Sequence, residues 1–347
     1  MSTATAYALL SANGVFEKTT IERRELRPTD VRIAIKFAGI CHSDIHTARQ
    51  EWGTSSFPLV PGHEIAGIVE EVGSQVSRLS PGDRVGVGCM VNSCRECENC
   101  LAGEEQYCAK GNIGTYNSKD VDDTITLGGY STTIVVDEHF VASIPEGISL
   151  EHAAPLLCAG ITMYSPLKRW GAGPGKRVAI LGLGGLGHVG VKIAKAMGAE
   201  VSILSRSTGK EVDAARLGAS NFYITEDRET MRSLRNHFDL IVNTVSAPIK
   251  VDSFLSLLRF NGVLTNVGVS PEPMSARFSS LAQNNRALAA SGIGGMRETQ
   301  EMLNFCAAHG VGAEIEVISG SEIDAAYDRV VASDVRYRFV IDISTFH

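Results

Sequence analysis

Residues 178–187 read VAILGLGGLG, four apolar residues followed by glycines at the spacing G-x-G-x-x-G. The glycine spacing alone arises easily by chance in a chain with 35 glycines among 347 residues, so its weight comes from its context. Here it follows an apolar run typical of a buried parallel strand and opens a stretch with helical periodicity. In that context Gly182 permits a tight turn, Gly184 lets backbone N–H groups approach a pyrophosphate, and Gly187 lets the helix pack closely on the strand. The stretch therefore predicts a dinucleotide-binding fold, with contacts from Gly182, Gly184, Gly185, Leu186 and Gly187.

Strand and helix patterns alternate through the part of the chain that follows residue 150. Helical patterns at 188–197 and 211–217 each end at a glycine, which is typical of a helix C-terminus. Such alternation is typical of a parallel sheet with crossover helices, so we predict a doubly wound α/β domain. The expected strands are 177–181, 200–204, 221–224, 239–242 and 263–267.

The first 150 residues have a different, β-rich pattern. Residues 31–36 alternate between apolar and polar side chains, as a half-buried strand does. Shorter strands are expected at 65–72 and 84–87, between pairs of turn-forming residues. The chain returns to mixed segments near its end and finishes on an expected strand at 338–343. At this length two domains or one large one are expected.

The end of the second strand of the α/β domain indicates which dinucleotide binds. An NAD site places Asp or Glu there, about 20 residues after the glycines, to bind the ribose 2′-hydroxyl. This chain instead has hydroxyls and cations at that place, which suit the 2′-phosphate of NADP(H). An exposed basic turn without a ligand is the alternative. The residues concerned are Ser205, Arg206, Ser207 and Lys210.

Composition excludes several classes of protein. Hydrophobic residues make up 44% of the chain and charged residues 20%, which excludes a disordered protein. With 32 Lys and Arg against 39 Asp and Glu, the net charge of −7 offers no overall basic field for nucleic acid or an anionic membrane. Residues 1–14 lack the features of a signal peptide, and the longest apolar stretch, 178–197, is interrupted by glycines, a histidine and two lysines. We therefore expect a cytoplasmic protein.

Four cysteines lie within fifteen positions and predict a metal site. Cys94, Cys97, Cys100 and Cys108 are half of the eight cysteines in the chain. In a reducing compartment such a cluster points to metal rather than to disulfides. Four thiolates suit a tetrahedral, closed and therefore structural zinc site. An iron–sulfur cluster is the alternative with the same ligands.

A second cluster of metal-binding residue types is spread over three segments. Cys41, His63 and Cys158 form the Cys₂His set that leaves the fourth zinc position open, as catalytic zinc requires. Asp44 would orient His63. Glu64 would lie close enough to enter the metal sphere when substrate is absent. Taken singly, a buried cysteine and a hydrogen-bonded core histidine are the alternatives.

With these motifs together, the chain resembles the zinc-dependent medium-chain alcohol dehydrogenases, most closely their cinnamyl-alcohol-dehydrogenase branch. The resemblance covers essentially the whole chain and rests on the four-cysteine loop and on residues 39–46, 62–64, 158–162 and 334–339. It implies a β-rich GroES-like catalytic domain and a Rossmann domain. The catalytic domain would comprise 1–152, with its structural-zinc loop at 89–110, and 293–347. The dinucleotide-binding domain would comprise 153–292.

The resemblance also implies a role for each matching residue. Cys41, His63 and Cys158 would hold the catalytic zinc, with Glu64 as its alternating neighbour, and the four-cysteine loop would hold one structural zinc. Ser43 would accept the substrate proton and His46 would pass it to solvent. The remaining cofactor contacts would be Thr162 near the nicotinamide, Arg338 on the pyrophosphate, and Thr244, Val245, Val269 and Ile293 along the cleft.

The predicted function is that of an NADP(H)-dependent alcohol dehydrogenase working mainly as an aldehyde reductase, and the resemblance implies a homodimer. The rivals are an NAD-dependent polyol or short-chain alcohol dehydrogenase and a non-catalytic NADP(H)-sensing zinc protein. Cys89 and Cys306 are interpreted as structural or incidental. Trp52 is expected either to line the substrate pocket or to serve ordinary packing.

Overall fold

The computed structural model describes residues 2–270 and 272–346. Its chain forms two compact units. The first unit contains the residues up to Cys158 together with those from Gly294 onward, and the second contains Ala159–Ile293. The first unit is thus discontinuous in sequence, because the C-terminal segment returns to it.

The second unit is built on a six-stranded parallel sheet with the order β12-β11-β10-β13-β14-β15. β10 carries the apolar run and lies centrally, where Val178 is beside Val201 of β11 and Leu240 of β13. The order reverses between β10 and β13, which is where this fold binds ligands beyond the carboxyl ends of its strands. The predicted doubly wound sheet is confirmed. Its strands are β10 (Arg177–Leu181), β11 (Glu200–Ser205), β12 (Asn221–Ile224), β13 (Phe238–Asn243), β14 (Leu258–Asn266) and β15 (Ala287–Ala290).

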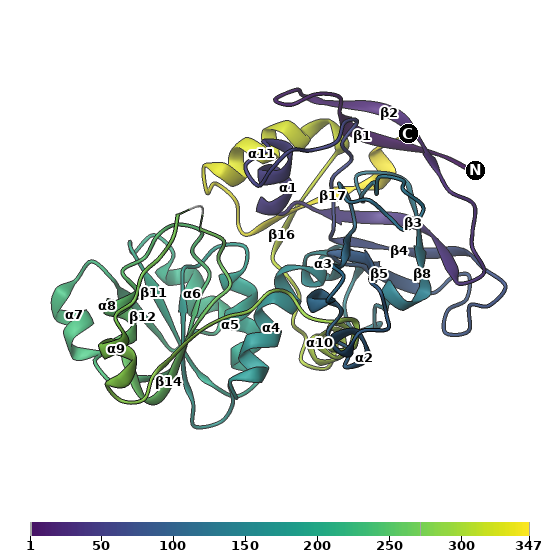
Figure 1. The fold of residues 1–347 in the computed structure, drawn as a ribbon. Helices are drawn as coiled ribbons and strands as arrows, with labels where there is room; N and C mark the ends of the chain where they lie inside the picture. The colour runs from purple at the N-terminus through teal and green to yellow at the C-terminus, as the bar shows by residue number, and fades with distance from the viewer. Residues whose placement is uncertain (1, 271, 347) are drawn as a thin grey trace. The chain divides into compact units, whose positions relative to one another are not determined.

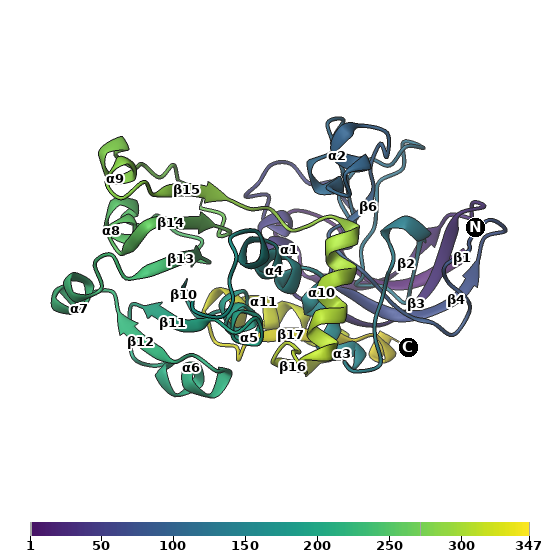
Figure 2. The ribbon, with the colours of Figure 1, turned by 90° about the horizontal axis from the view of Figure 1, so that it is seen from below.

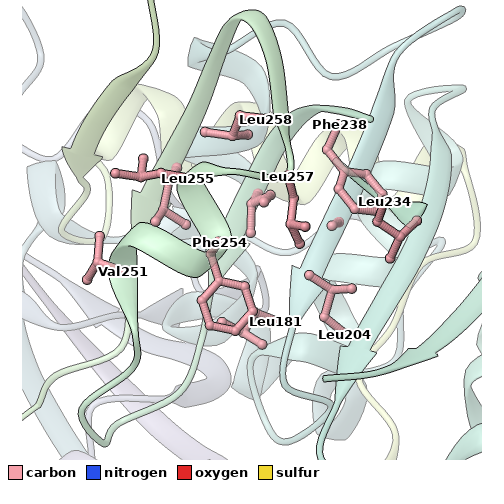
Figure 3. Packing of buried hydrophobic residues seen from close by; sticks show 12 residues of the cluster. Leu181, Leu204, Leu234, Phe238, Val251, Phe254, Leu255, Leu257 and Leu258 are labelled. Atoms are coloured by element: carbon pink, nitrogen blue, oxygen red, sulfur yellow. The ribbon is translucent and has the colours of Figure 1, made fainter. Parts of the chain in front are cut away.

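Helices cover both faces of this sheet. In Figure 1, α5 lies on one side of the sheet, and α8 and α9 lie together on the other. Figure 3 shows the core beneath α8, where Phe238 and Phe254 pack among leucine side chains, all fully or nearly fully buried. Burial of each such side chain contributes about 1.5–3 kcal/mol. The helices of this unit are α4 (Ala159–Arg169), α5 (Gly187–Ala196), α6 (Glu211–Leu217), α7 (Arg228–Ser233), α8 (Val251–Leu255) and α9 (Phe278–Ala282).

The first unit is built on a sheet with the order β16-β17-β3-β4-β5-β9, and β8 also pairs with β3. β17, from the end of the chain, runs antiparallel beside β3, with Val340 opposite Gly39 (Figure 1). β3 extends well beyond the expected 31–36, and Ile33 and Ile35 point into the core. The strands of the sheet are β3 (Asp30–Gly39), β4 (Ile65–Val72), β5 (Arg84–Val87), β8 (Thr133–Asp137), β9 (Ala142–Ser143), β16 (Ile315–Ile318) and β17 (Arg338–Asp342).

Two hairpins and several helices complete the first unit. Figure 2 shows α2 standing with β6 at one edge of this unit. No helix in the described ranges is both long and apolar enough to cross a membrane. The remaining strands and α-helices are β1 (Ser2–Leu9), β2 (Phe16–Arg23), β6 (Met90–Asn92), β7 (Ile113–Gly114), α1 (His42–Ala48), α2 (Glu98–Leu101), α3 (Leu150–Ala153), α10 (Met296–Ala308) and α11 (Ile323–Val331).

The first stretch of the first unit ends at Cys158, six residues after the expected boundary at residue 152. The short helix η3 (Ala154–Leu157) packs on β3, β4 and β5, so it belongs to the first unit together with Cys158. The sequence pattern does not show this, because residues 154–157 are apolar and would suit the core of either unit. The second division, between Ile293 and Gly294, lies next to the expected one.

Candidate functional site

Three distant segments of the first unit bring Cys41, His63 and Cys158 together. Cys41 caps the N-terminus of α1 directly after β3, and His63 precedes β4. β3 and β4 are antiparallel, with Ala38 opposite Ile65, so these two residues meet at the same end of the sheet. The short helix η3, which ends just before Cys158, packs on the same strands and so places Cys158 beside Cys41. The Sγ atoms of Cys41 and Cys158 are 3.9 Å apart.

The donor set fits a zinc ion. One ligand atom from each of Cys41, His63, Glu64 and Cys158 lies within 4.8 Å of the others, and all four residues are buried. Tetrahedral zinc with Zn–S bonds of about 2.3 Å requires roughly 3.8 Å between sulfurs, which the observed pair matches. Glu64 Oε2 is buried and has no hydrogen-bond partner among the described residues. The cluster therefore offers two sulfurs, one imidazole and an adjacent carboxylate to a metal.

Asp44 fixes the positions of two members of the cluster, Cys41 and His63. Its carboxylate is fully buried and accepts hydrogen bonds from the backbone N–H groups of Cys41 (2.8 Å) and Gly62 (3.3 Å). It also lies 3.0 Å from His63 Nδ1. Burial lowers the pKa of His63, but the charges of Asp44, Cys89 and Cys41 together outweigh that effect, and the pKa lies well above its ordinary value. The contact between Nδ1 and the Asp44 carboxylate fixes a proton on Nδ1, which leaves Nε2 to face a metal.

Glu64 is paired with Arg338, which is also buried. Burial raises the pKa of Glu64 to about 7, although the guanidinium of Arg338 acts in the opposite direction. β17 supplies this arginine, so the C-terminal return of the chain completes the surroundings of the metal cluster. The expected contact between Arg338 and a pyrophosphate stays a prediction.

Ser43 and His46 both lie on α1, next to the cluster. The Cys41 thiol donates to Ser43 Oγ at 3.5 Å. His46 Nδ1 pairs with the Glu51 carboxylate, and its ring stacks on Trp52 with centroids 4.7 Å apart. Trp52 is half exposed. Sequence reasoning missed the pairing of Glu51 with His46. The only local signal for it is that a carboxylate follows the histidine by five positions.

Cys89, which the sequence analysis interpreted as structural or incidental, contacts the cluster. It follows β5 and hydrogen-bonds Cys158, an interaction that lowers the pKa of the Cys89 thiol. Gly88 makes this approach possible, because a side chain there would lie 2.8 Å from the Leu157 carbonyl oxygen. Cys306 instead lies in the core on α10 and contacts Met302 at 3.7 Å, and burial raises its pKa to about 12.

The four-cysteine loop also closes around one point. The ligand atoms of Cys94, Cys97, Cys100 and Cys108 lie within 4.8 Å of one another, and the Sγ atoms of Cys94 and Cys100 are 3.9 Å apart. Two of the sulfurs accept backbone N–H groups, Cys108 from Cys94 and Cys97 from Ala109, each at 3.4 Å. The hydrogen bond from Ala109 is the largest contribution that lowers the pKa of Cys97, to about 6. These sulfurs therefore suit a closed tetrahedral metal site.

Glu105 fastens this loop to the rest of the first unit. Its side chain is buried, lies 2.7 Å from His139 Nε2, and accepts the backbone N–H of Met296 at 3.0 Å. Burial acts to raise the pKa of Glu105, but the hydrogen bonds from His139 and Met296 outweigh it and the pKa is lowered. The ionised form of Glu105 is therefore the one that stabilises the fold.

In the second unit the glycine loop has the geometry expected for a phosphate cradle. Gly182 has φ = +92°, which favours glycine, and α5 begins at Gly187, where a side chain would collide with the Gly182 carbonyl oxygen. At the end of β11, Ser205 Oγ donates to the Ser207 carbonyl at 3.0 Å. Lys210 Nζ reaches back to the Leu183 carbonyl at 2.8 Å, so the second strand and the glycine loop are joined.

The other expected cofactor residues of this unit lie at strand ends or on α4. Thr244 Oγ1 donates to the Leu181 carbonyl at 2.9 Å, directly beside the glycine turn. The backbone N–H of Val245 donates to Asn243 Oδ1 at 3.1 Å. Thr162 is buried on α4, and Val269 is half exposed after β14. Ile293 ends the unit with φ = +21°.

Comparison with known proteins gives consistent matches. The model of the alcohol dehydrogenase GroES-like domain matches residues 27–146, and that of zinc-binding dehydrogenases matches residues 185–308. The chain is 58% identical to NADP-dependent alcohol dehydrogenase C 1 of Mycolicibacterium smegmatis over 99% of both chains. Its structure is similar to a cinnamyl alcohol dehydrogenase of Sorghum bicolor, with a TM-score of 0.95, 40% identity, and 99% and 98% of the two chains covered. The corresponding Helicobacter pylori enzyme in complex with NADP(H) gives 0.92 and 41%, with the same coverage.

The anchoring role of Glu105 gives a stability prediction. Glu105→Ala should lower the free energy of unfolding at pH 7 by about 1–3 kcal/mol, because His139 and Met296 lose their acceptor. Glu96→Ala is the matched control in the same loop, since its ion pair with Lys110 is exposed and should contribute little to stability. Urea unfolding measures both.

The difference between wild type and Glu105→Ala should also depend on pH. It should be full above about pH 4.3, the ordinary pKa of Glu in an unfolded chain, and should shrink as the pH falls through the lower folded pKa. An unfolding free energy for Glu105→Ala equal to that of Glu96→Ala at pH 7 would contradict the anchoring role.

Proposed function

This chain belongs to the zinc-binding dehydrogenase family, and on that premise we propose that it is a zinc-dependent alcohol dehydrogenase. It transfers a hydride between NADP(H) and a primary alcohol or aldehyde. The observation that carries this proposal is the buried cluster of Cys41, His63, Glu64 and Cys158. Its ligand types leave one position for a substrate oxygen, which distinguishes it from the closed four-cysteine site.

The residues around the cluster have separable tasks in the reaction. A zinc ion held by Cys41, His63 and Cys158 would supply the Lewis acidity that polarises a substrate carbonyl. Asp44 fixes the ring of His63 and its tautomer. Glu64, with an unpartnered Oε2, is the carboxylate proposed to approach the metal when substrate is absent.

Proton transfer is assigned to α1. Ser43 lies beside Cys41 and is proposed to exchange a proton with the substrate oxygen. His46 is proposed to carry that proton onward to solvent. The Glu51 carboxylate at Nδ1 and the stacked Trp52 ring hold the orientation of its imidazole.

The preference for NADP(H) is assigned to the end of β11. Ser205, Arg206, Ser207 and Lys210 offer hydroxyls and cations to a 2′-phosphate, and this tip has no carboxylate that would select NAD. The Mycolicibacterium smegmatis relative is an NADP-dependent enzyme and the Helicobacter pylori structure contains NADP(H), which supports this assignment. The roles of Thr162, Thr244, Val245, Val269, Ile293 and Arg338 in cofactor binding are part of the same proposal.

We also propose that the protein works as a cytoplasmic homodimer. β15 ends the order of the parallel sheet, so its outer edge is available for pairing with a second chain. Leu288 on this strand is about half exposed, although it is apolar.

Light scattering on the purified protein should give twice the mass of one chain, and a monomeric mass would contradict the dimer.

Removal of a cluster ligand tests the reaction class. Cys158→Ser should lower kcat for NADPH-dependent reduction of cinnamaldehyde by at least about a thousandfold, because one donor to the metal is lost. Zinc content should fall from two ions per chain to one, while circular dichroism stays that of the wild type. The oxidation of NADPH is followed at 340 nm. Near-normal turnover by this variant would remove Cys158 from the catalytic site.

A charge reversal tests the cofactor preference. Arg206→Asp should lower the ratio of kcat/KM for NADPH over NADH by about tenfold or more, because it replaces a charge-assisted contact by repulsion. Arg228→Asp is the matched control, another exposed arginine of the same unit at the start of α7. If the ratio moves equally in both variants, the assignment of Arg206 to the 2′-phosphate is wrong.

A further inference from the structure

Asp44 has a donor that the proposed mechanism does not use. Tyr130 is fully buried, and its hydroxyl donates to Asp44 Oδ2 at 3.2 Å. Its ring lies against Gly62, where a side chain would come within 2.7 Å of Tyr130 Cδ1 and where φ is +105°. Tyr130 therefore contacts both the carboxylate that holds His63 and the residue that precedes His63 in the chain.

A second buried tyrosine, Tyr327, contacts the hydroxyl of Tyr130. Tyr327 on α11 donates its hydroxyl to the Tyr130 oxygen at 3.4 Å. α11 packs beside α1, the helix that carries Asp44 (Figure 1). Phe16 contacts both rings, with centroids 5.9 Å from Tyr130 and 5.1 Å from Tyr327. Burial raises the pKa of each tyrosine well above its ordinary value, so both hydroxyls keep their protons.

The loop that carries Tyr130 is itself held rigidly. The guanidinium of Arg23 is buried and donates to the carbonyls of Leu127, Gly128 and Thr133 and to Ser131 Oγ, at 2.6–2.9 Å. Gly128 packs so closely on the carbonyls of residues 61 and 62 that a side chain would not fit. The phenol is thus fixed from both sides of its loop, and its hydroxyl has little freedom to leave Asp44.

We propose that Tyr130 is a positioning residue for the catalytic metal site. Its hydroxyl, oriented by Tyr327, fixes the Asp44 carboxylate that in turn fixes His63. Removing the hydroxyl leaves a buried carboxylate with one donor fewer, which loosens its orientation. This inference rests on the proposed function, since it concerns the metal held by Cys41, His63 and Cys158.

The test is Tyr130→Phe, which keeps the packed ring and removes only the hydroxyl. Partners beyond the direct ligands contribute about 10–100-fold to metal affinity, and because Tyr130 acts through Asp44 we expect the lower end, about tenfold faster release of one zinc to a chelator. Release from the four-cysteine loop is the internal control and should not change. The cobalt-substituted protein should show shifted d–d bands, and kcat should fall while KM for NADPH stays constant.

Two further variants separate positioning from general destabilisation. Tyr327→Phe removes the donor to Tyr130 but leaves the Asp44 contact, so it should give a smaller effect in the same direction. Tyr7→Phe is the matched control, because the Tyr7 ring packs on Phe346 in the same unit. It should leave zinc release and the cobalt spectrum at wild-type values.

The outcomes of this experiment are distinct. Unchanged zinc release and an unchanged cobalt spectrum in Tyr130→Phe, with two zinc ions bound by the wild type, would overturn the inference and leave the proposed function standing. Equal acceleration at both zinc sites would also overturn it, since that is general destabilisation. A wild-type chain that binds zinc only in the four-cysteine loop would overturn the proposed function itself, and the inference with it.

Discussion

One buried carboxylate, that of Asp44, ties together the segments on which the metal cluster depends. It joins the N-terminus of α1, the turn before β4 and the ring of His63. An ionised group without solvent exposure is tolerated only when donors surround it, so each of these contacts restricts the others. The result is that one side chain sets the positions of Cys41 and His63, while the packing of η3 places Cys158 beside them.

The candidate sites of the two units differ in how far apart in the sequence their residues lie. The dinucleotide loop of the second unit is local, because strand, turn and helix follow one another from β10 to α5. The first unit depends instead on the return of the C-terminal segment, whose β17 pairs with β3 and brings Arg338 to Glu64. Truncation of that segment would therefore affect the cluster, although none of the three expected metal ligands lies in it.

What the sequence could predict follows from how local each feature is. The four-cysteine loop and the glycine loop each consist of residues close together in the sequence, so their spacing predicts them. The parallel sheet follows from the regular alternation of strand and helix patterns. The set Cys41, His63 and Cys158 required residue chemistry together with a family resemblance. Tyr130 lies 86 positions from Asp44, and only tertiary packing brings it there. The contact of Cys89 with Cys158 also depends on tertiary packing, so the sequence analysis interpreted Cys89 only as structural or incidental. The boundary near Cys158 differs from the expected one because η3 is uniformly apolar.

The central claim is that the chain holds an open zinc site beside a closed one. Anomalous X-ray diffraction from crystals of the purified protein, recorded on both sides of the zinc absorption edge, tests it most directly. Two peaks per chain are predicted, one within the four-cysteine loop and one bonded to Cys41, His63 and Cys158 with a further position free for a small molecule. A single peak in the four-cysteine loop, in zinc-saturated protein, would contradict the account.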